Sequence, residues 1–251
     1  MESPKVYGKG RKMIYCIHSS RLPEAARECL LSLGFSPIAL PPSSEVSEAI
    51  SHHVDLSLFL SDGIGFVTRE GYERVHPLCP SLSLSVIEEE LVPRYPEEAR
   101  LNVLTVGKNA FYLKGNAPGV LLAHLKEKGY ALHTVKQGYP ACTVLALDSR
   151  HAISADRGML RALKECGIEV LPICDGGVML PPFPYGFLGG AAGVFRDTVY
   201  FIGDVRTHPD GRRIVDFIEG CGMRALSLCD GPLLDLGGLA FFEINDDEDG
   251  K

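Results

Sequence analysis

Among the eight cysteines of this chain, Cys142 has the position best suited to nucleophilic chemistry. It follows the segment 138–140 (GYP) and begins a predicted apolar strand, TVLAL. A thiolate is a good nucleophile, and a neighbouring cation lowers the pKa of a thiol. The alternative is that Cys142 is a small buried hydrophobic residue, as free cysteines usually are. We expect structural roles for the other cysteines, at positions 16, 29, 79, 166, 174, 221 and 229.

His53 and Asp55 form a His-x-Asp pair at the start of another predicted strand. Side chains two residues apart on a strand lie on one face, so the carboxylate would lie beside the imidazole. A carboxylate in this place orients a histidine for proton transfer. The alternative is a helix end capped by His52, with Asp55 facing solvent. These residues could also compose a metal site, but no HExxH or paired Cys/His spacing supports one, and we expect no metal.

Four other polar residues lie beside predicted turns or helix starts. Asp204 and His208 bound the loop GDVRTHPDG, Asp235 precedes the glycine pair at 237–238, and Arg21 opens the first predicted helix. Carboxylates here could bind a cationic ligand, and Arg21 could bind a ligand carboxylate. Structural alternatives exist for all four. Asp204 and His208 could cap a turn or helix, Asp235 could bind backbone N–H groups, and Arg21 could be a surface cation.

The glycines at 186, 189, 190 and 193 have the composition of a phosphate-binding loop but not its context. A strand rather than a helix is predicted after them, so neither a dinucleotide fingerprint nor a P-loop is supported. We expect close backbone packing or a bulge at these glycines, and no cofactor.

These candidate residues lie between the elements of a repeated unit. Predicted helices start about 40–50 residues apart, a period typical of repeat architectures, and occupy 22–33, 69–75, 118–128, 157–166 and 209–221. Short apolar strands follow each helix and precede it, which gives five strand–strand–helix–strand units. The first unit lacks a leading strand, and the strand at 236–244 could supply it and close a ring. The pattern predicts a five-bladed α/β propeller. An open α/β sheet is the alternative, but it expects one strand before each helix.

Length and composition limit the function classes. With 251 residues, of which 45% are hydrophobic, the chain has the composition of a globular protein. A net charge of −7 argues against nucleic acid as the main partner. The longest apolar runs have about 7 residues against the roughly 20 needed to cross a membrane. No secretory signal or CxxC pair is present, so we expect reduced thiols and a cytoplasmic location. We expect an N-terminal extension at 1–12, one domain at 13–245 and an acidic tail at 246–251.

Five segments resemble an uncharacterised bacterial family assigned to the pentein fold, that of the guanidino-group-modifying enzymes. They are HHVDLSLFL (52–60), KQGYPACTVLALDSRHAISADRG (136–158), YGFLGGAAG (185–193), YFIGDVRTHPDGRRI (200–214) and LLDLGG (233–238). The resemblance covers roughly residues 13–245. It implies five units around a pseudo-fivefold axis with a polar channel along it, which Cys142 could face. In the catalytic members a cysteine thiolate attacks the guanidinium carbon, a histidine transfers protons, and carboxylates hold the cationic substrate.

The resemblance does not carry over the nucleophile of those enzymes. Theirs lies near the C-terminus on a strand after a glycine-rich turn, and the matching segment 235–240 (DLGGLA) has no cysteine. If the chain is an enzyme, we expect a hydrolase or deiminase that acts on a small guanidino or amidino compound. Cys142 would be the nucleophile and His53 the acid and base. The substrate would be bound by Asp55, Asp204 and Asp235, with His208 and Arg21 as further contacts. The alternative is a non-catalytic propeller that binds a ligand or a protein. The sequence indicates no oligomeric state.

Overall fold

The computed structural model describes residues 12–245. Residues 1–11 of the expected extension and the expected tail at 246–251 lie outside the described residues, whereas Lys12 begins the first strand. Within 12–245 the strands form five three-stranded sheets and one two-stranded sheet. Each three-stranded sheet joins an antiparallel pair to a parallel third strand. The sheets are β17 (Ala240–Asn245), β1 (Lys12–Ser19) and β2 (Ser36–Leu40); β3 (Phe59–Ser61), β4 (Ile64–Val67) and β5 (Ser83–Val86); β6 (Leu104–Val106), β7 (Asn109–Leu113) and β8 (Ala131–Val135); β9 (Val144–Ala146), β10 (His151–Ser154) and β11 (Glu169–Pro172); and β13 (Ala192–Phe195), β14 (Thr198–Phe201) and β15 (Arg224–Ser227).

A helix connects the second strand of each sheet to the third, because parallel strands cannot be joined by a tight turn. These helices are α1 (Glu24–Ser32), α3 (Arg69–Val75), α4 (Gly119–Glu127), α6 (Arg157–Glu165) and α7 (Gly211–Gly220). Their boundaries lie within two residues of those predicted from sequence. The Asp156 carboxylate accepts a hydrogen bond from the Met159 N–H at 2.7 Å and so caps the start of α6. Gly167, just after the end of α6, has a φ of 74°, which favours glycine and ends the helix.

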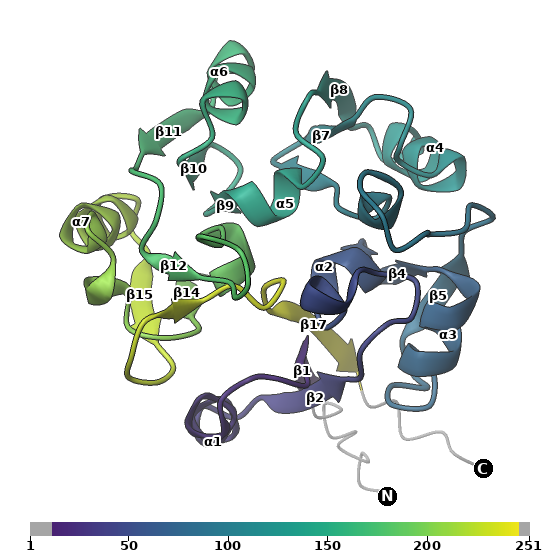
Figure 1. Cartoon of the computed structure of the whole chain (residues 1–251), viewed down its shortest axis with the longest axis horizontal. Helices are drawn as coiled ribbons and strands as arrows, with labels where there is room; N and C mark the ends of the chain where they lie inside the picture. The colour runs from purple at the N-terminus through teal and green to yellow at the C-terminus, as the bar shows by residue number, and fades with distance from the viewer. Residues whose placement is uncertain (1–11, 246–251) are drawn as a thin grey trace, which may run out of the picture.

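The last strand pairs with the first, which confirms the prediction that a strand near the C-terminus supplies the leading strand missing from the first unit. β17 runs antiparallel to β1, with Ile17 opposite Ala240 and Tyr15 opposite Phe242. The Tyr15 and Phe242 rings stack with centroids 5.3 Å apart. Figure 1 shows the yellow β17 beside the purple β1, so the two ends of the described chain share one sheet.

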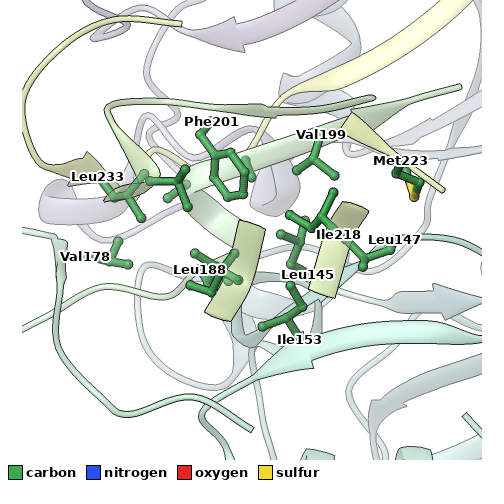
Figure 2. Packing of buried hydrophobic residues seen from close by; sticks show 14 residues of the cluster. Leu145, Leu147, Ile153, Val178, Leu188, Val199, Phe201, Ile218, Met223 and Leu233 are labelled. Atoms are coloured by element: carbon green, nitrogen blue, oxygen red, sulfur yellow. The ribbon is translucent and has the colours of Figure 1, made fainter. Parts of the chain in front are cut away.

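Hydrophobic side chains fill the space between neighbouring sheets and their helices. In the cluster drawn in Figure 2, Leu145 of β9 and Ile153 of β10 pack with Val199 and Phe201 of β14 and with Ile218 of α7. Ile153, Val199, Phe201 and Ile218 are all fully buried. Burial of each such side chain stabilises the fold by about 1.5–3 kcal/mol. The cluster therefore fixes two consecutive sheets relative to each other.

Short helical turns precede the leading strands β3, β6, β9 and β13 of four sheets, and they were not predicted from sequence. They are α2 (Val54–Ser57) before β3, η2 (Glu97–Ala99) before β6, α5 (Pro140–Thr143) before β9, and η3 (Gly189–Ala191) before β13. The expectation that His53–Asp55 and Cys142 lie directly at strand starts is therefore wrong. His53 is the N-cap residue of α2, and Cys142 lies within α5. Pro140 at the first position favours the turn, since its fixed φ is helical.

In Figure 1 the turns α2 and α5 lie toward the middle of the molecule, and the five connecting helices lie at its periphery. Two further short helices, η1 (Glu48–Ile50) and η4 (Val205–Thr207), lie in loops. The two-stranded sheet pairs β12 (Val178–Met179) in parallel with β16 (Leu233–Leu234). None of the helices in residues 12–245 is both long and apolar enough to cross a membrane.

Candidate functional site

The segments that precede the leading strands contact one another in succession. On one side, the Asp55 N–H donates to the Gly237 carbonyl at 3.2 Å, which joins α2 to the turn before β17. The N–H groups of Leu236 and Gly238 both donate to the Gly190 carbonyl, at 2.9 and 2.8 Å. The turn before β17 is therefore bonded to both α2 and η3.

The contacts continue from η3 through α5 and back to α2. A Cβ atom added to Gly189 would lie 2.3 Å from the Ala141 carbonyl oxygen, so only glycine permits this approach of η3 to α5. The Ala141 N–H donates to Asn102 Oδ1 at 2.8 Å, and Asn102 Nδ2 donates to Asp55 Oδ2 at 2.9 Å. The close packing predicted for the glycines at 186–193 is confirmed here. Five segments far apart in the sequence thus converge.

Cys142 and Asp55 are in direct contact at this convergence. The Cys142 thiol donates to Asp55 Oδ2, with Sγ and Oδ2 2.6 Å apart. Asn102 Nδ2 lies 3.2 Å from the same sulfur, so one amide group contacts both side chains. Cys142 and Asn102 are each 2% exposed. Asn102 was missed from sequence, although a polar residue inside the apolar segment LNVL marked it as unusual.

His53 lies between two carboxylates. Its Nδ1 is 4.0 Å from Asp55 Oδ1, and its Nε2 is 3.8 Å from Asp235 Oδ1. His53 Nε2 and Asp55 Oδ1 are buried and form no hydrogen bond within the described structure. A buried polar atom without a partner costs free energy, and of these two residues His53 lines the cavity described below.

Asp235 is held rigidly by backbone N–H groups, which is the structural role expected for it as an alternative to ligand binding. Its Oδ2 accepts from the Phe187 N–H at 2.8 Å, and its Oδ1 accepts from the Gly237 N–H at 3.2 Å. The side chain is buried and packs against Gly190, where an added Cβ would lie 1.9 Å from Oδ1. This turn carboxylate also reaches His53 and lines the cavity described below, so the structural and binding interpretations are compatible.

Burial dominates the titration of these groups. It raises the pKa of Asp55 to about 6, against the opposing attraction of His53, and it raises the pKa of Asp235. Burial, followed by the negative charges of Asp55 and Asp235, raises the pKa of Cys142 well above its usual range. At neutral pH the resting site therefore contains a thiol that donates to an ionised Asp55.

A cavity of about 640 Å³ opens beside these residues. Its buried lining residues include His53, Cys142 and Asp235, which are 4%, 2% and 1% exposed. Glu98 lines it too, and the Glu98 carboxylate accepts hydrogen bonds from the Ser47 N–H at 2.9 Å and the Tyr139 hydroxyl at 2.8 Å. The remaining lining residues are Ile50, Pro93, Arg94, Tyr95, Leu180, Phe183, Pro184, Tyr185 and Phe187. A small molecule in this cavity could reach the Cys142 sulfur.

The other three expected site residues lie elsewhere, and none of them lines this cavity. Asp204 accepts from the Arg206 backbone N–H at 2.9 Å and pairs with the Arg206 guanidinium at 3.0 Å. The buried His208 accepts from the Asp210 N–H through Nδ1 at 3.0 Å. Arg21 is exposed. Asp204 and His208 therefore have the turn and cap contacts, and Arg21 the surface position, that were the structural alternatives to ligand binding.

Two groups of described residues could hold a metal ion by proximity, with one ligand atom of each residue within 4.8 Å of the others. One is His53, Asp55 and Cys142, an imidazole, carboxylate and thiolate set of the kind that binds zinc. The other is Cys174, His208 and Asp210. In that group both Asp210 oxygens are already bound, one by the Cys174 N–H and one by a guanidinium. The absence of a metal stays a prediction.

The chain matches a family of unknown function, DUF6873, over residues 17–240. No curated protein sequence matches it. Similar solved structures include a dimethylarginine dimethylaminohydrolase, which is 12% identical with a TM-score of 0.57 and aligns over 92% of this chain and 99% of that one. An agmatine deiminase from C. jejuni is 9% identical with a TM-score of 0.56, over 97% and 99% of the two chains. An inosamine-phosphate amidinotransferase from Streptomyces griseus is 14% identical with a TM-score of 0.53, over 93% of each chain.

At these identities the likeness is one of fold, and activity does not follow from it. The family match covers most of the chain, and the structural matches confirm the resemblance stated from sequence. The protein belongs to DUF6873, a family of unknown function, and it has the pentein fold.

Proposed function

We propose that this protein is a cysteine-dependent hydrolase that acts on a C–N bond of a small amidine or guanidine. One observation carries the proposal. The Cys142 thiol donates to Asp55 at 2.6 Å, and Cys142 and His53 both line a cavity of about 640 Å³. A nucleophile, a base in contact with it and a second acid or base are the groups that this chemistry needs.

The substrate cation would activate the thiol. In the free protein the buried carboxylates oppose thiolate formation. A bound amidinium places a positive charge near Asp55, Asp235 and Cys142, and it favours the thiolate by direct attraction. Its planar N–H groups match the geometry of a carboxylate, and the Asp235 carboxylate lines the cavity together with Cys142.

The reaction would proceed in two stages. The Cys142 proton passes to Asp55, the thiolate forms a bond with the amidinium carbon, and the C–N bond breaks as the amine takes a proton from the imidazolium form of His53. Water then attacks the S-linked carbon and returns a proton to His53. The C–S bond then breaks, and the Cys142 thiolate takes back the proton held by Asp55. The added hydroxyl group loses its proton to the amine released in the first stage, which becomes an ammonium ion. The products are an amide or urea and an ammonium ion.

We also propose that the five three-stranded sheets are blades of a closed α/β propeller with the site on its axis. Two observations support this arrangement. The pairing of β17 with β1 joins the two ends of the described part of the chain, residues 12–245. The contacts that link Asp55, Asn102, Ala141, Gly189 and Gly237 return to their starting point. A nucleophilic thiol must stay reduced, so we expect the protein to work in the cytoplasm.

A direct test is to treat the protein with 2-chloroacetamidine at neutral pH and to map the labelled thiol by mass spectrometry. We expect selective labelling of Cys142, absent in Cys142→Ser, because Cys142 is the cysteine that lines the cavity proposed to bind the amidinium probe. Cys16 is a matched control, since it is also buried but does not line the cavity. Release of ammonia from a panel of guanidino compounds should likewise be lost in Cys142→Ser. Equal labelling of all eight cysteines would overturn the proposal.

A second candidate function is ligand or protein binding without catalysis. It is favoured by the turn 235–240, which is the best match in this sequence to the segment that carries the nucleophile in the catalytic pentein enzymes, and which has no cysteine. In this case a cationic ligand should bind equally well to the wild type and to Cys142→Ser, with no product formed by either. Isothermal titration combined with the ammonia assay separates the two functions.

A further inference from the structure

The lining of the cavity differs in character between its buried and its exposed residues. The buried polar groups are the imidazole of His53, the thiol of Cys142 and the carboxylates of Asp235 and Glu98. Away from these groups the wall is mostly aromatic or aliphatic, and is built by Ile50, Pro93, Tyr95, Tyr139, Leu180, Phe183, Pro184, Tyr185 and Phe187. A ligand that fits both kinds of lining must carry its charge at one end only.

Large apolar side chains are exposed at the mouth before any ligand binds. Tyr95, Phe183 and Tyr185 are 50%, 47% and 39% exposed. They come from two segments that lie far apart in the sequence, 93–95 and 180–187, and both segments line the same cavity. Exposed apolar surface that adjoins a polar site favours contact with an apolar part of a ligand.

The aromatic wall is supported from behind. The Tyr95 and Tyr139 rings lie 5.5 Å apart, and Tyr139 is anchored through its hydroxyl to the buried Glu98. Gly138 allows Tyr95 to approach the backbone, since an added Cβ would lie 2.3 Å from the Tyr95 ring. The ring of Tyr95 is therefore seated by the local structure and is part of the cavity wall.

Charge excludes a substituent with a carboxylate. Arg94 is the cationic residue among the lining residues described. Its side chain is 74% exposed and pairs with Glu97 at 3.3 Å, so it offers little to an incoming anion. The carboxylates of Asp235 and Glu98, in contrast, would repel a second anionic group on the ligand.

We infer that the substrate is an amidine or guanidine whose substituent is uncharged and apolar, such as an arylalkyl group, and not an amino acid side chain. This inference rests on the proposed function, because it places the amidine beside Cys142. The amidine binds at the carboxylate end, and the substituent lies against Tyr95, Phe183 and Tyr185. The cavity volume of about 640 Å³ accommodates a substituent of this size.

The test compares binding of two unreactive probes to Cys142→Ser by isothermal titration. We expect phenethylguanidine to bind at least about tenfold more tightly than arginine, since an apolar pocket discriminates by about this factor for each group it accepts or rejects. Phe183→Ala should reduce this preference severalfold. Leu78→Ala removes a similarly exposed apolar side chain (42% exposed) that does not line the cavity, and it should leave the preference unchanged. Equal or tighter binding of arginine would overturn the inference.

Labelling of the wild type separates this inference from the proposed function. If 2-chloroacetamidine labels Cys142 but phenethylguanidine shows no preference, only the inference fails. If phenethylguanidine binds preferentially but no amidine probe labels Cys142, the inferred ligand class holds and the hydrolase function fails. Loss of the preference in Leu78→Ala as well as in Phe183→Ala would contradict the assignment of the aromatic wall.

Discussion

At the residue scale, the hydrogen bond from Cys142 to Asp55 joins the proposed nucleophile to the carboxylate proposed as its base. Burial raises the pKa of Asp55 to about 6, so this carboxylate is ionised at neutral pH but is a stronger base than an ordinary aspartate. The pKa of Cys142 is also raised, so the thiol does not ionise by itself near neutral pH. Proton transfer to Asp55 in the presence of a cation is the route that remains.

This arrangement predicts how labelling of Cys142 by 2-chloroacetamidine depends on pH. Asp55 must be deprotonated to accept the thiol proton, so the rate should be low below pH 5 and should rise through about pH 6 to a plateau. Asp55→Asn keeps a hydrogen-bond acceptor but not the base, and should lose this inflection and slow labelling by about 10²–10⁴-fold. Stopped-flow or quenched mass spectrometry measures the rate. An unchanged profile in Asp55→Asn would show that another group takes the proton.

Asn102 is predicted to position both of these side chains. Asn102→Ala removes the amide that contacts Asp55 and Cys142 and leaves the Ala141 N–H without its acceptor. We expect a loss of about 1–3 kcal/mol in the free energy of unfolding together with a large fall in the labelling rate at Cys142. Asn116→Ala is the control, because Asn116 is a buried asparagine whose side-chain amide donates to the Pro96 carbonyl and not to Cys142 or Asp55. It should lose comparable stability in urea denaturation yet label at the wild-type rate.

At the scale of elements, periodicity predicted the five connecting helices and the strands around them, because apolar spacing and glycine stops are local properties. The turns α2, α5, η2 and η3 were not predicted. Each has three or four residues, too few for a helical period to emerge. Each is also bonded to a segment of another unit. For the same reason, Cys142, Asp235 and the His53–Asp55 pair could each be proposed as site residues from sequence, whereas Asn102 was missed. Their convergence depends on tertiary contacts between segments.

The glycines of η3 permit that convergence, and this can be tested by substitution. Gly190→Ala would place a Cβ 1.9 Å from Asp235 Oδ1, so either η3 or the buried carboxylate must shift. We expect a loss of about 1–3 kcal/mol in the free energy of unfolding, together with reduced labelling of Cys142. Gly220→Ala at the end of α7 is the control, since an added Cβ meets no atom within 4 Å, and it should be neutral or slightly stabilising. Urea denaturation of both variants measures the difference, and equal stability would contradict the close contact.

At the scale of the whole molecule, the site depends on how the ends of the chain are joined. The turn that carries Asp235 and Gly237 leads directly into β17, and β17 is held by its pairing with β1. Stacking of Phe242 on Tyr15 and burial of Phe242 in the neighbouring core add to that pairing. The exposed ion pair of Lys12 with Glu243 contributes little, as surface pairs generally do. Hydrophobic closure, more than charge, therefore holds the turn against α2 and η3.

A truncation pair tests this dependence. Removal of residues 240–251 deletes β17 and exposes the edge of β1, so we expect a loss of at least about 3–5 kcal/mol, the cost of removing a buried phenylalanine alone. Labelling of Cys142 should also fall, although Cys142 lies in another sheet, because Asp235 would lose its fixed position. Removal of residues 246–251 alone keeps β17 and should preserve both stability and labelling. If Phe242→Ala in the full chain is destabilised but still labels at the wild-type rate, then closure stabilises the fold without positioning the site. Reduced labelling in both Phe242→Ala and the longer truncation, at temperatures where each remains folded by circular dichroism, would establish that the joined ends position the site.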